Sequence, residues 1–378
     1  MIDDLRLHGA LVGCQGSRDS LNTPVLVLDL DALDRNIVAM AALVTARGIA
    51  LRPHAKTHKS VDIARRQIAA GAIGLCCAKL GEAEALAEGG IAGLHLTSPV
   101  VTPPAIARLA ALATRSERLT VVVDSPANVA ALARAVAGAA TPLGVIIDID
   151  PGIRRTGVAS AADAVALALA IARCPSLDYR GVQFYCGSQQ HIEDYAERRA
   201  AIEDRTDYLR TVIAALTDAG FAPAIVTGSG TGSHAIDLDL GVFTELQVGS
   251  YVFMDRQYHD CDLTGASDAP FETALFIDAR VISANSSGLA TIDAGYKAMA
   301  TDGGPPTIVA GTGAGAKFVF MGDEHGAVIG ADPLAIGDRV TLATPHCDPT
   351  VNLYDSFHVV RGETLIDIWP VSARGRSR

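Results

Sequence analysis

The chain has 378 residues, 49% of them hydrophobic, so it is long enough for a large core and for more than one domain. Its formal net charge of −11 argues against a nucleic-acid-binding surface and gives no support for binding to anionic membranes. No run of about 18 apolar residues is free of charge, so no transmembrane helix is predicted, and the first residues lack the basic region of a signal peptide.

Seven cysteines are scattered along the chain, and the adjacent pair Cys76 and Cys77 lies in an apolar run. An odd, scattered set of this kind is typical of reduced thiols and not of a disulfide scaffold. The sequence therefore predicts a cytoplasmic protein.

The first predicted strand covers residues 23–31, TPVLVLDLD. From residue 48 onward, apolar runs of strand length alternate with Ala-rich runs that are long enough for helices. This alternation indicates a parallel sheet with helical crossovers. The eight predicted strands cover residues 48–54, 71–78, 92–98, 118–124, 143–150, 180–186, 223–228 and 243–251. Four predicted helices cover residues 81–90, 103–115, 125–139 and 160–174.

Eight strands and their helices fit a closed (β/α)8 TIM-like barrel, and an open doubly wound sheet is the alternative. After about residue 265, short β-rich runs are broken by Gly, Asn and Asp, which predicts a second, mostly β domain. The barrel does not need the strand at 23–31, so we assign that strand to the β domain. The predicted division is a barrel at 32–260 and a β-rich domain built from 1–31 together with 261–378.

Reactive residues of a (β/α)8 barrel stand at the C-terminal ends of its strands. In this sequence the ends of the predicted strands are rich in polar residues and glycine. The first strand is followed by Lys56, the fifth by Arg155, and the sixth by Tyr185 and His191. We expect these side chains at one rim of the barrel.

The segment 51–60, LRPHAKTHKS, concentrates positive charge in an acidic chain, with Lys56 among His54, His58 and Lys59. Neighbouring positive charge and partial burial lower the pKa of a lysine and so provide a free amine nucleophile. We interpret Lys56 as such a nucleophile, and a solvated basic turn is the alternative. The same charge would help to hold an anionic cofactor and a substrate carboxylate.

Two small-residue loops follow the seventh and eighth predicted strands. In TGSGTGS, residues 227–233, backbone N–H groups can converge on a phosphate, and the turn at 249–251 offers further small residues. A flexible turn is the alternative. A lysine nucleophile and a phosphate loop on one rim suggest pyridoxal 5'-phosphate, whose aldehyde takes the lysine as a Schiff base and whose phosphate requires a cradle.

The predicted β domain contains TPHCDPTVNLYD, residues 344–355. If the backbone is extended here, the side chains of His346 and Asp348 face one side and that of Cys347 faces the other. One nitrogen and one carboxylate oxygen suit Mn²⁺ or Mg²⁺ better than the thiolate-rich sites preferred by Zn²⁺. A polar turn before Pro349 is the alternative interpretation.

The runs RPHAKTHK and HCDPTVNLYD resemble motifs of the D-threonine aldolase and D-serine dehydratase family. This family consists of pyridoxal-phosphate enzymes of the alanine racemase type (fold type III). The resemblance extends from TPVLVLDLDALDRNI to WPVSARG, nearly the whole chain. It implies a (β/α)8 barrel with a β domain, usually as a homodimer with active sites near the subunit interface.

The resemblance also implies roles for single positions in the barrel. Lys56 matches the Schiff-base lysine, and Arg155 matches an arginine near the phenolic oxygen of the cofactor. Tyr185 lies where the family places a contact to the cofactor ring, and His191 matches the proposed base of the aldolases. The positions that match the phosphate cradle are Ser229, Gly230, Thr231, Gly232, Gly249, Ser250 and Tyr251.

His346 and Asp348 match the metal pair of the aldolase branch of this family. The dehydratase branch has His-x-Cys at these positions, so Asp348 favours an aldolase. The resemblance thus implies metal-assisted cleavage of a D-β-hydroxy-α-amino acid, with D-threonine giving glycine and acetaldehyde.

Three alternatives to this function remain open. A 3-hydroxy-D-aspartate aldolase would use the same residues and release glyoxylate. A D-serine-type dehydratase would use Lys56 to take the α-proton and the metal to remove hydroxide. A non-catalytic pyridoxal-phosphate carrier is the non-enzyme alternative, but it leaves the β domain and the His346–Asp348 pair unexplained.

Overall fold

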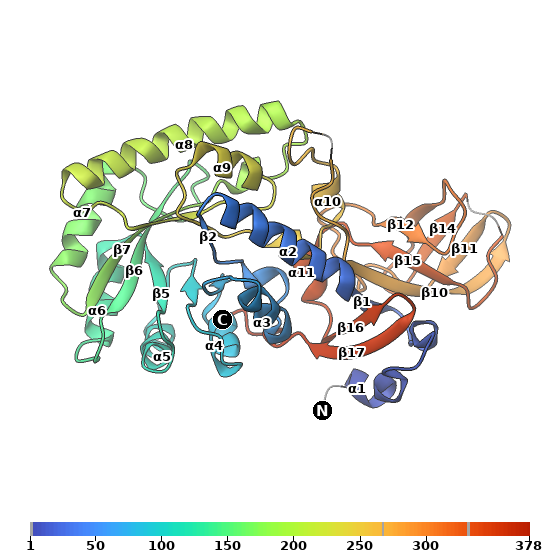
Figure 1. The fold of residues 1–378 in the computed structure, drawn as a ribbon. Coiled ribbons are helices and arrows are strands. Elements are labelled where there is room, and N and C mark those ends of the chain that lie inside the picture. Colours follow the sequence, from blue (N-terminus) through green and yellow to red (C-terminus); the bar gives the residue numbers. More distant parts are fainter. Residues whose placement is uncertain (1–2, 267, 331–332) are drawn as a thin grey trace.

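Two sheets lie side by side in the computed structural model, which describes residues 3–266, 268–330 and 333–378 (Figure 1). One sheet has eight parallel strands and the other has nine strands in a mostly antiparallel arrangement. The predicted combination of a TIM-like barrel and a β-rich region is confirmed.

The eight-stranded sheet closes into a barrel. Its strands follow the order β2-β9-β8-β7-β6-β5-β4-β3, and a parallel bridge between His54 and Cys76 joins the two ends. The Cys76 N–H donates to the Pro53 carbonyl at 2.8 Å, which leaves no open edge there. The strands are β2 (Ala50–Leu51), β3 (Cys76–Cys77), β4 (His95–Leu96), β5 (Thr120–Val123), β6 (Leu143–Ile149), β7 (Leu177–Phe184), β8 (Ile225–Gly228) and β9 (Glu245–Leu246). Each lies within or overlaps one of the eight predicted runs.

Helices surround the barrel, and their starts follow simple sequence signals. Asp29 caps the first helix by accepting the N–H groups of Asp31 and Ala32, and Pro103 and Pro126 each stand in the first turn of a helix. The helices are α2 (Leu30–Ala46), α3 (Val61–Ala69), α4 (Leu80–Glu88), α5 (Pro103–Ala113), α6 (Pro126–Ala135), α7 (Ala161–Ala172), α8 (Tyr195–Asp218) and α9 (His234–Leu240). Of the helices that the structure describes, none combines the length and apolar character needed to cross a bilayer.

The second sheet contains strands from both ends of the chain. The N-terminal strand β1 pairs antiparallel with β10 and parallel with β16, as expected for the strand at 23–31. The strands are β1 (Val25–Asp29), β10 (Leu275–Ser286), β11 (Leu289–Ile292), β12 (Thr307–Ala310), β13 (Lys317–Phe320), β14 (Gly326–Ile329), β15 (Arg339–Ala343), β16 (Ser356–Arg361) and β17 (Thr364–Pro370). The division of the chain at residues 31/32 and 260/261 stays a prediction.

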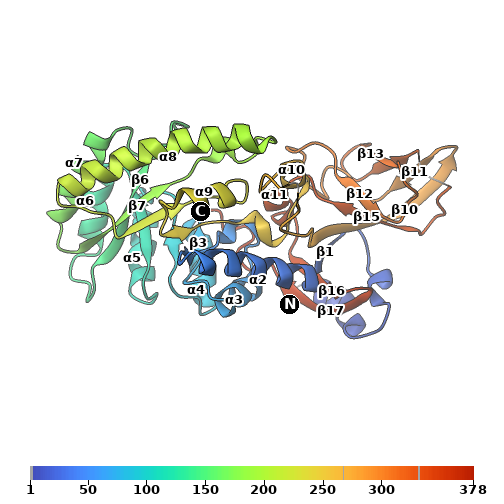
Figure 2. The same cartoon turned by 45° about the horizontal axis from the view of Figure 1, so that its top comes forward.

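Side chains of β1 alternate between two hydrophobic clusters. Leu26 and Leu28 enter the main core, which continues into the barrel, whereas Val25 and Val27 pack with residues of β16 and β17. The N-terminal helix α1 (Asp3–His8) lies beside β16 and β17 in both views (Figures 1 and 2). The N-terminal segment thereby covers the β16–β17 end of the second sheet, and the sheet is joined to the barrel through a shared core.

Two short helices lie at the junction of barrel and sheet: α10 (Arg256–His259) and α11 (Cys347–Val351). Short 3₁₀ turns complete the structure at η1 (Gly9–Leu11), η2 (Ser17–Ser20), η3 (Ala55–Thr57), η4 (Gly187–Gln189) and η5 (Ser250–Val252).

Candidate active site

A cavity of about 600 Å³ opens at the C-terminal ends of the barrel strands. Loops that follow β2, β6, β7, β8 and β9 supply much of its lining, as the position of reactive residues in barrels predicts. The predicted site residues that line it are Lys56, Arg155, Tyr185, Ser229, Gly230, Thr231, Gly249 and Ser250.

Lys56 lies in the 3₁₀ turn η3 directly after β2. His54 holds this turn, because its Nδ1 accepts the Lys56 backbone N–H at 3.3 Å while its Nε2 lies 3.2 Å from Thr97 Oγ1. The Lys56 ammonium donates to Asp348 Oδ2 at 2.6 Å. A lysine of the barrel thus meets a carboxylate of the C-terminal region at the cavity.

The positive charge of segment 51–60 is compensated, contrary to our expectation. Attraction to Asp348 raises the pKa of Lys56 against the effect of burial, so the predicted lowering is wrong for this structure. Burial lowers the pKa of His54 well below its ordinary value and that of His58 to about 4, which leaves both rings neutral at pH 7. Lys59 Nζ lies 3.4 Å from Glu82. Each lysine of the run therefore has a carboxylate partner, and the run provides no uncompensated positive field.

The side chain of Gln190 holds the glycine loop after β8 through hydrogen bonds. The Gly232 N–H donates to Gln190 Oε1 at 3.0 Å, and Gln190 Nε2 donates to Ser233 Oγ at 2.9 Å. A Cβ at Gly232 would collide with the backbone carbonyl oxygen of Gln190, so this close packing requires glycine there. Tyr251 is fully buried and donates its N–H to Thr231 Oγ1 at 3.0 Å, which joins the two predicted phosphate loops. Gly232 and Tyr251 thus support the loops from behind.

Unpaired backbone donors at the cavity fit an anionic group. Among the described residues, the N–H groups of Thr231, Gly249 and Ser250 have no hydrogen-bond partner, and all three residues line the cavity. Ser229 adopts a φ of 71°, a conformation that is costly for a residue with a Cβ and that is enriched at functional sites. These features are those of a phosphate cradle and fit pyridoxal phosphate.

Aromatic rings line or border the other side of the site. The Arg155 guanidinium lies over the Tyr185 ring, 5.4 Å from its centre, so the two side chains stack in a cation–π contact. His191 packs on Tyr258 with ring centres 4.6 Å apart. Burial lowers the pKa of His191, and the nearby positive charge of Lys56 acts in the same direction. His191 is therefore neutral at pH 7 and able to accept a proton.

His346 and Asp348 come together by a route that the sequence did not predict. The expected extended backbone is wrong, because helix α11 begins at Cys347 and only His346 has extended dihedral angles. Asp255, which is fully buried, accepts the Cys347 N–H at 2.9 Å and the Tyr258 N–H at 3.2 Å. Asp255 thus caps both α10 and α11 and holds Asp348 above Lys56.

Both members of the predicted metal pair carry a ligand atom that fits a hard cation. Burial alone would raise the pKa of Asp348, but the Lys56 ammonium, through its charge and its hydrogen bond, holds that pKa well below its usual range, so the carboxylate is ionised. His346 Nδ1 lies 2.7 Å from Asp302 Oδ2, which fixes the proton on Nδ1 and leaves Nε2 with a free lone pair. A carboxylate oxygen and an imidazole nitrogen suit Mn²⁺ or Mg²⁺.

A second His and Asp cluster lies far from the cavity, at the N-terminal helix. Within the described residues, Asp4, His8 and His358 are the one group of three whose potential ligand atoms all lie within 4.8 Å of one another. His8 Nε2 accepts the Asn22 N–H at 3.0 Å, so the ring proton lies on Nδ1 and is donated to His358 Nε2 at 2.8 Å. Both facing nitrogens are used in this hydrogen bond. We interpret the cluster as a docking contact of α1.

Sequence reasoning missed two residues that act on the site. Asp302 lies in the run TDGGPP, and its only signal is an acidic residue in a Gly- and Pro-rich loop. Asp255 ends the run QVGSYVFMD after the eighth strand, where its position at the rim was the available signal.

Comparison with known proteins agrees with this geometry. Residues 28–257 match the family model of the alanine racemase N-terminal domain, and residues 274–360 match that of a putative serine dehydratase domain. The chain is 40% identical to a 3-hydroxy-D-aspartate aldolase of Paracoccus denitrificans (strain Pd 1222), over 94% of this chain and 93% of that protein. It is 38% identical to a D-threonine aldolase of Arthrobacter sp., over 95% and 94% of the two chains.

A solved structure gives the same result. The crystal structure of D-threonine aldolase from Filomicrobium marinum is similar with a TM-score of 0.91 and 39% identity, covering 95% of this chain and 98% of that one. The chain therefore belongs to the alanine racemase-type family that includes D-threonine aldolase and 3-hydroxy-D-aspartate aldolase.

Proposed function

We propose that this protein is a pyridoxal-phosphate- and divalent-metal-dependent aldolase that cleaves D-β-hydroxy-α-amino acids, with D-threonine giving glycine and acetaldehyde. The observation that carries the proposal is the contact of Lys56 Nζ with Asp348 Oδ2 at 2.6 Å, beside a cavity with unpaired backbone donors. An amine that can bind the cofactor and a carboxylate that can bind a metal lie next to each other. This arrangement fits a reaction in which the bond between Cα and Cβ of an amino acid is broken.

The residues of the barrel rim would hold the cofactor. Lys56 would supply the amine, and the unpaired N–H groups of Thr231, Gly249 and Ser250 would bind the phosphate. Ser229, Gly230, Gly232 and Tyr251 shape this cradle. Tyr185 would contact the cofactor ring, and Arg155, which stacks on Tyr185 and also lines the cavity, would bind the phenolic oxygen. Bound pyridoxal phosphate supplies an aldehyde for the substrate amine and an electron sink for the bond that breaks.

His346 and Asp348 would hold the metal, with Mn²⁺ or Mg²⁺ as the best match to their donor atoms. A divalent ion there supplies a Lewis acid that makes a β-hydroxyl group more acidic. His191 accepts the hydroxyl proton, for which its lowered pKa provides a neutral ring. The oxygen then forms the carbonyl of the aldehyde, while the electron pair of the Cα–Cβ bond stays with Cα. Cα then takes up one proton, which balances the proton that His191 removed from the hydroxyl group, and gives glycine.

Product analysis tests this function. The full-length protein with pyridoxal phosphate and Mn²⁺ is incubated with D-threonine, L-threonine and D-serine, with and without EDTA. The proposal expects acetaldehyde and glycine from D-threonine alone and no product after chelation. Formation of a 2-oxo acid and ammonia would replace the aldolase by a dehydratase, and cleavage of L-threonine would contradict the assigned stereochemistry.

A second candidate substrate is 3-hydroxy-D-aspartate, which would give glycine and glyoxylate. It is favoured by Lys79, which lines the cavity and offers a cation for a β-carboxylate. The 40% identity to a 3-hydroxy-D-aspartate aldolase also supports it. The ratio of kcat/KM for the two substrates decides between them. If Lys79 binds the second carboxylate, Lys79→Met lowers kcat/KM for 3-hydroxy-D-aspartate and leaves that for D-threonine unchanged.

We also propose a homodimer in the cytoplasm. The edge of the second sheet exposes large apolar side chains, among them Val309 on β12, Val319 on β13 and Met321 beside it, which a subunit contact would cover. All seven cysteines are free, which suits a reducing compartment. Sedimentation equilibrium tests the dimer, and Val319→Asp should shift the equilibrium towards monomer.

A further inference from the structure

The Asp302 carboxylate makes a short hydrogen bond with the side chain of His346. Asp302 Oδ2 lies 2.7 Å from His346 Nδ1. An ionised carboxylate can only accept, so the imidazole proton must lie on Nδ1. The remaining nitrogen, Nε2, is then the one that keeps a lone pair for a metal.

We propose that Asp302 is a positioning residue of the metal site, which fixes the tautomer and the direction of the His346 ring so that Nε2 is the metal-binding atom. This inference rests on the proposed function, because it takes His346 and Asp348 as the metal ligands. Carboxylate partners of this kind orient metal-binding histidines and raise their basicity.

The loop that carries Asp302 is anchored to helix α11. Thr350 Oγ1 accepts the Ala300 N–H at 3.0 Å and donates to the His346 carbonyl at 2.7 Å. The same hydroxyl therefore joins the loop before Asp302 to the residue whose ring Asp302 contacts. The loop and the ring cannot easily move apart without breaking one of these bonds.

A second anchor holds the loop on its other side. Arg256 of α10 donates from Nη2 to the Gly303 carbonyl, and its backbone N–H donates to the Thr344 carbonyl at 3.1 Å. Gly304 has a φ of 83°, which allows the sharp turn after Asp302 and Gly303. Asp302 is thus placed between two fixed points, one on each short helix.

Two other interpretations of Asp302 fit the structure less well. As a surface ion pair it would contribute little to stability, because 57% of its side chain is exposed. As a third metal ligand it would need its oxygen close to both His346 and Asp348. Within the described ranges, Asp302, His346 and Asp348 do not form a group whose ligand atoms lie within 4.8 Å of one another. The remaining interpretation is that Asp302 contacts Nδ1 of His346, on the side of the ring away from the metal.

The test is the affinity of the holoenzyme for Mn²⁺ in the absence of substrate, measured from the electron paramagnetic resonance signal of free Mn²⁺. Asp302→Ala should weaken binding by about 10- to 100-fold, the usual effect of losing such a partner. Asp302→Glu, which keeps a carboxylate, should recover part of the affinity. The cofactor absorbance and the melting temperature should stay unchanged, since Asp302 contacts neither the cofactor site nor the core.

Matched variants make each outcome decisive. Asp323→Ala removes another exposed carboxylate of the same region, which lies 3.9 Å from Lys297, and should leave Mn²⁺ affinity unchanged. Unchanged affinity in Asp302→Ala overturns the inference, and so does a loss as complete as that in Asp348→Ala, which would make Asp302 a ligand. No recovery with Asp302→Glu also counts against a positioning role.

His346→Ala separates this inference from the function on which it rests. If His346→Ala abolishes Mn²⁺ binding and Asp302→Ala does not affect it, the metal site stands and only the role of Asp302 fails. If His346→Ala binds Mn²⁺ like the unchanged protein, the proposed metal site itself fails and the role of Asp302 fails with it.

Discussion

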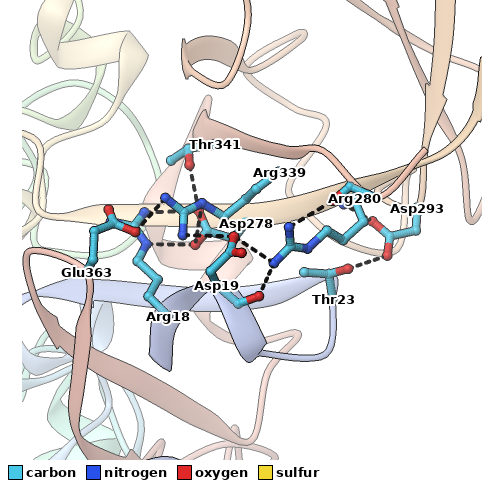
Figure 3. A network of polar contacts seen from close by, with 10 residues as sticks. Arg18, Asp19, Thr23, Asp278, Arg280, Asp293, Arg339, Thr341 and Glu363 are labelled. Atoms are coloured by element: carbon cyan, nitrogen blue, oxygen red, sulfur yellow. Dashed lines mark hydrogen bonds and ion pairs between the residues drawn. The ribbon is translucent and has the colours of Figure 1, made fainter. Parts of the chain in front are cut away.

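Asp278 and Asp348 are both carboxylates that pair with a cation from the other end of the chain, but their surroundings differ. Asp278 accepts two hydrogen bonds from Arg18, at 2.8 and 3.0 Å, and one from Thr341 at 2.7 Å, and its side chain is 1% exposed (Figure 3). Asp348 has one close cation, the Lys56 ammonium, beside a cavity of about 600 Å³.

The difference lies in how completely each carboxylate is satisfied. Figure 3 shows Asp278 inside a network in which Arg18, Arg339 and Glu363 converge, so no further ligand can reach it. Lys56 remains 41% exposed, so its contact with Asp348 can open when another group takes the amine. The saturated Asp278 ties the N-terminal segment to the second sheet. Asp348 accepts from Lys56 and, at 3.7 Å, from Cys347 Sγ, and because its close cation can be displaced it is available for chemistry.

The largest expected effect follows from replacing the amine beside Asp348. Lys56→Ala should abolish aldol cleavage, because among the described residues Lys56 is the lysine that both lines the cavity and contacts Asp348. Borohydride reduction of the holoenzyme followed by peptide mapping should leave a pyridoxyl group on Lys56 only. A label on Lys79, which also lines the cavity, would contradict the assignment.

Replacing Asp348, the carboxylate beside the cavity, tests the difference between Asp348 and Asp278 most directly. Asp348→Ala should abolish Mn²⁺ binding and aldol cleavage while the protein stays folded. It should also lower the pKa of Lys56, whose value is raised chiefly by Asp348. A larger fraction of free amine at pH 7 would then let the cofactor attach faster, which stopped-flow absorbance can measure. Unchanged cleavage in Asp348→Ala would show that Asp348 takes no part in the reaction.

His191 is expected to serve the reaction without holding the cofactor. His191→Phe keeps an aromatic ring against Tyr258 but removes the proton acceptor. Turnover should fall by roughly 10²-fold or more, the usual weight of one general base, while the cofactor absorbance stays. Turnover close to that of the unchanged enzyme would show that another group accepts the proton.

Replacing Asp278, the fully hydrogen-bonded carboxylate, should lower the free energy of unfolding and leave catalysis unchanged. Asp278→Ala leaves Arg18 without its buried partner and should lower the free energy of unfolding by about 3–5 kcal/mol. Denaturant unfolding measures this, with Lys297→Ala as the control, since the ion pairs of Lys297 are exposed. At a temperature where the variant is folded, kcat should be unchanged. A stable but inactive variant would contradict the division of roles.

A smaller, pH-dependent effect is expected at the docking contact of α1. Burial lowers the pKa of His358 to about 4 and also lowers that of His8, while Asp4 acts in the opposite direction on both. The undocked state, in which both rings are exposed to water, therefore binds more protons between about pH 4 and 6.5, and docking weakens as the pH falls through this range. The loss at pH 5 should be on the order of 1–2 kcal/mol.

Hydrogen exchange of residues 3–22 at pH 7 and pH 5 checks this prediction. Protection should be lower at pH 5. Replacing both His8 and His358 by Gln should make protection independent of pH over this range, because no ring remains to be protonated. Equal protection of the unchanged protein at both pH values would contradict the docking role of the pair.

Periodicity predicted eight strands with helical crossovers but left an open doubly wound sheet as the alternative, and the family resemblance then implied the closed barrel. Each strand is a short apolar run set apart by helix-forming residues, and the position of reactive groups at strand ends then followed from barrel geometry. The strand β1 could be assigned to the second sheet because the barrel was already complete without it. These features depend on local sequence and on general rules of topology.

Contacts between distant segments were beyond the sequence. Helix α11 was missed because it has only five residues and depends on Asp255, 92 residues away, for its first hydrogen bond. The direction of the Lys56 pKa was wrong because its nearest charge, Asp348, is 292 residues away. Asp302 belongs to no motif and gains meaning only from its distance to His346.

The function is tested most directly by the products formed from D-threonine with pyridoxal phosphate, with and without Mn²⁺. We expect equal amounts of glycine and acetaldehyde with Mn²⁺ and no product without it. We expect Asp348→Ala to form no products with or without Mn²⁺. We expect Asp278→Ala to cleave D-threonine and to require Mn²⁺ as the unchanged protein does. Cleavage that proceeds equally well without metal, or a 2-oxo acid and ammonia as the products, would contradict the proposed role of the Lys56–Asp348 site.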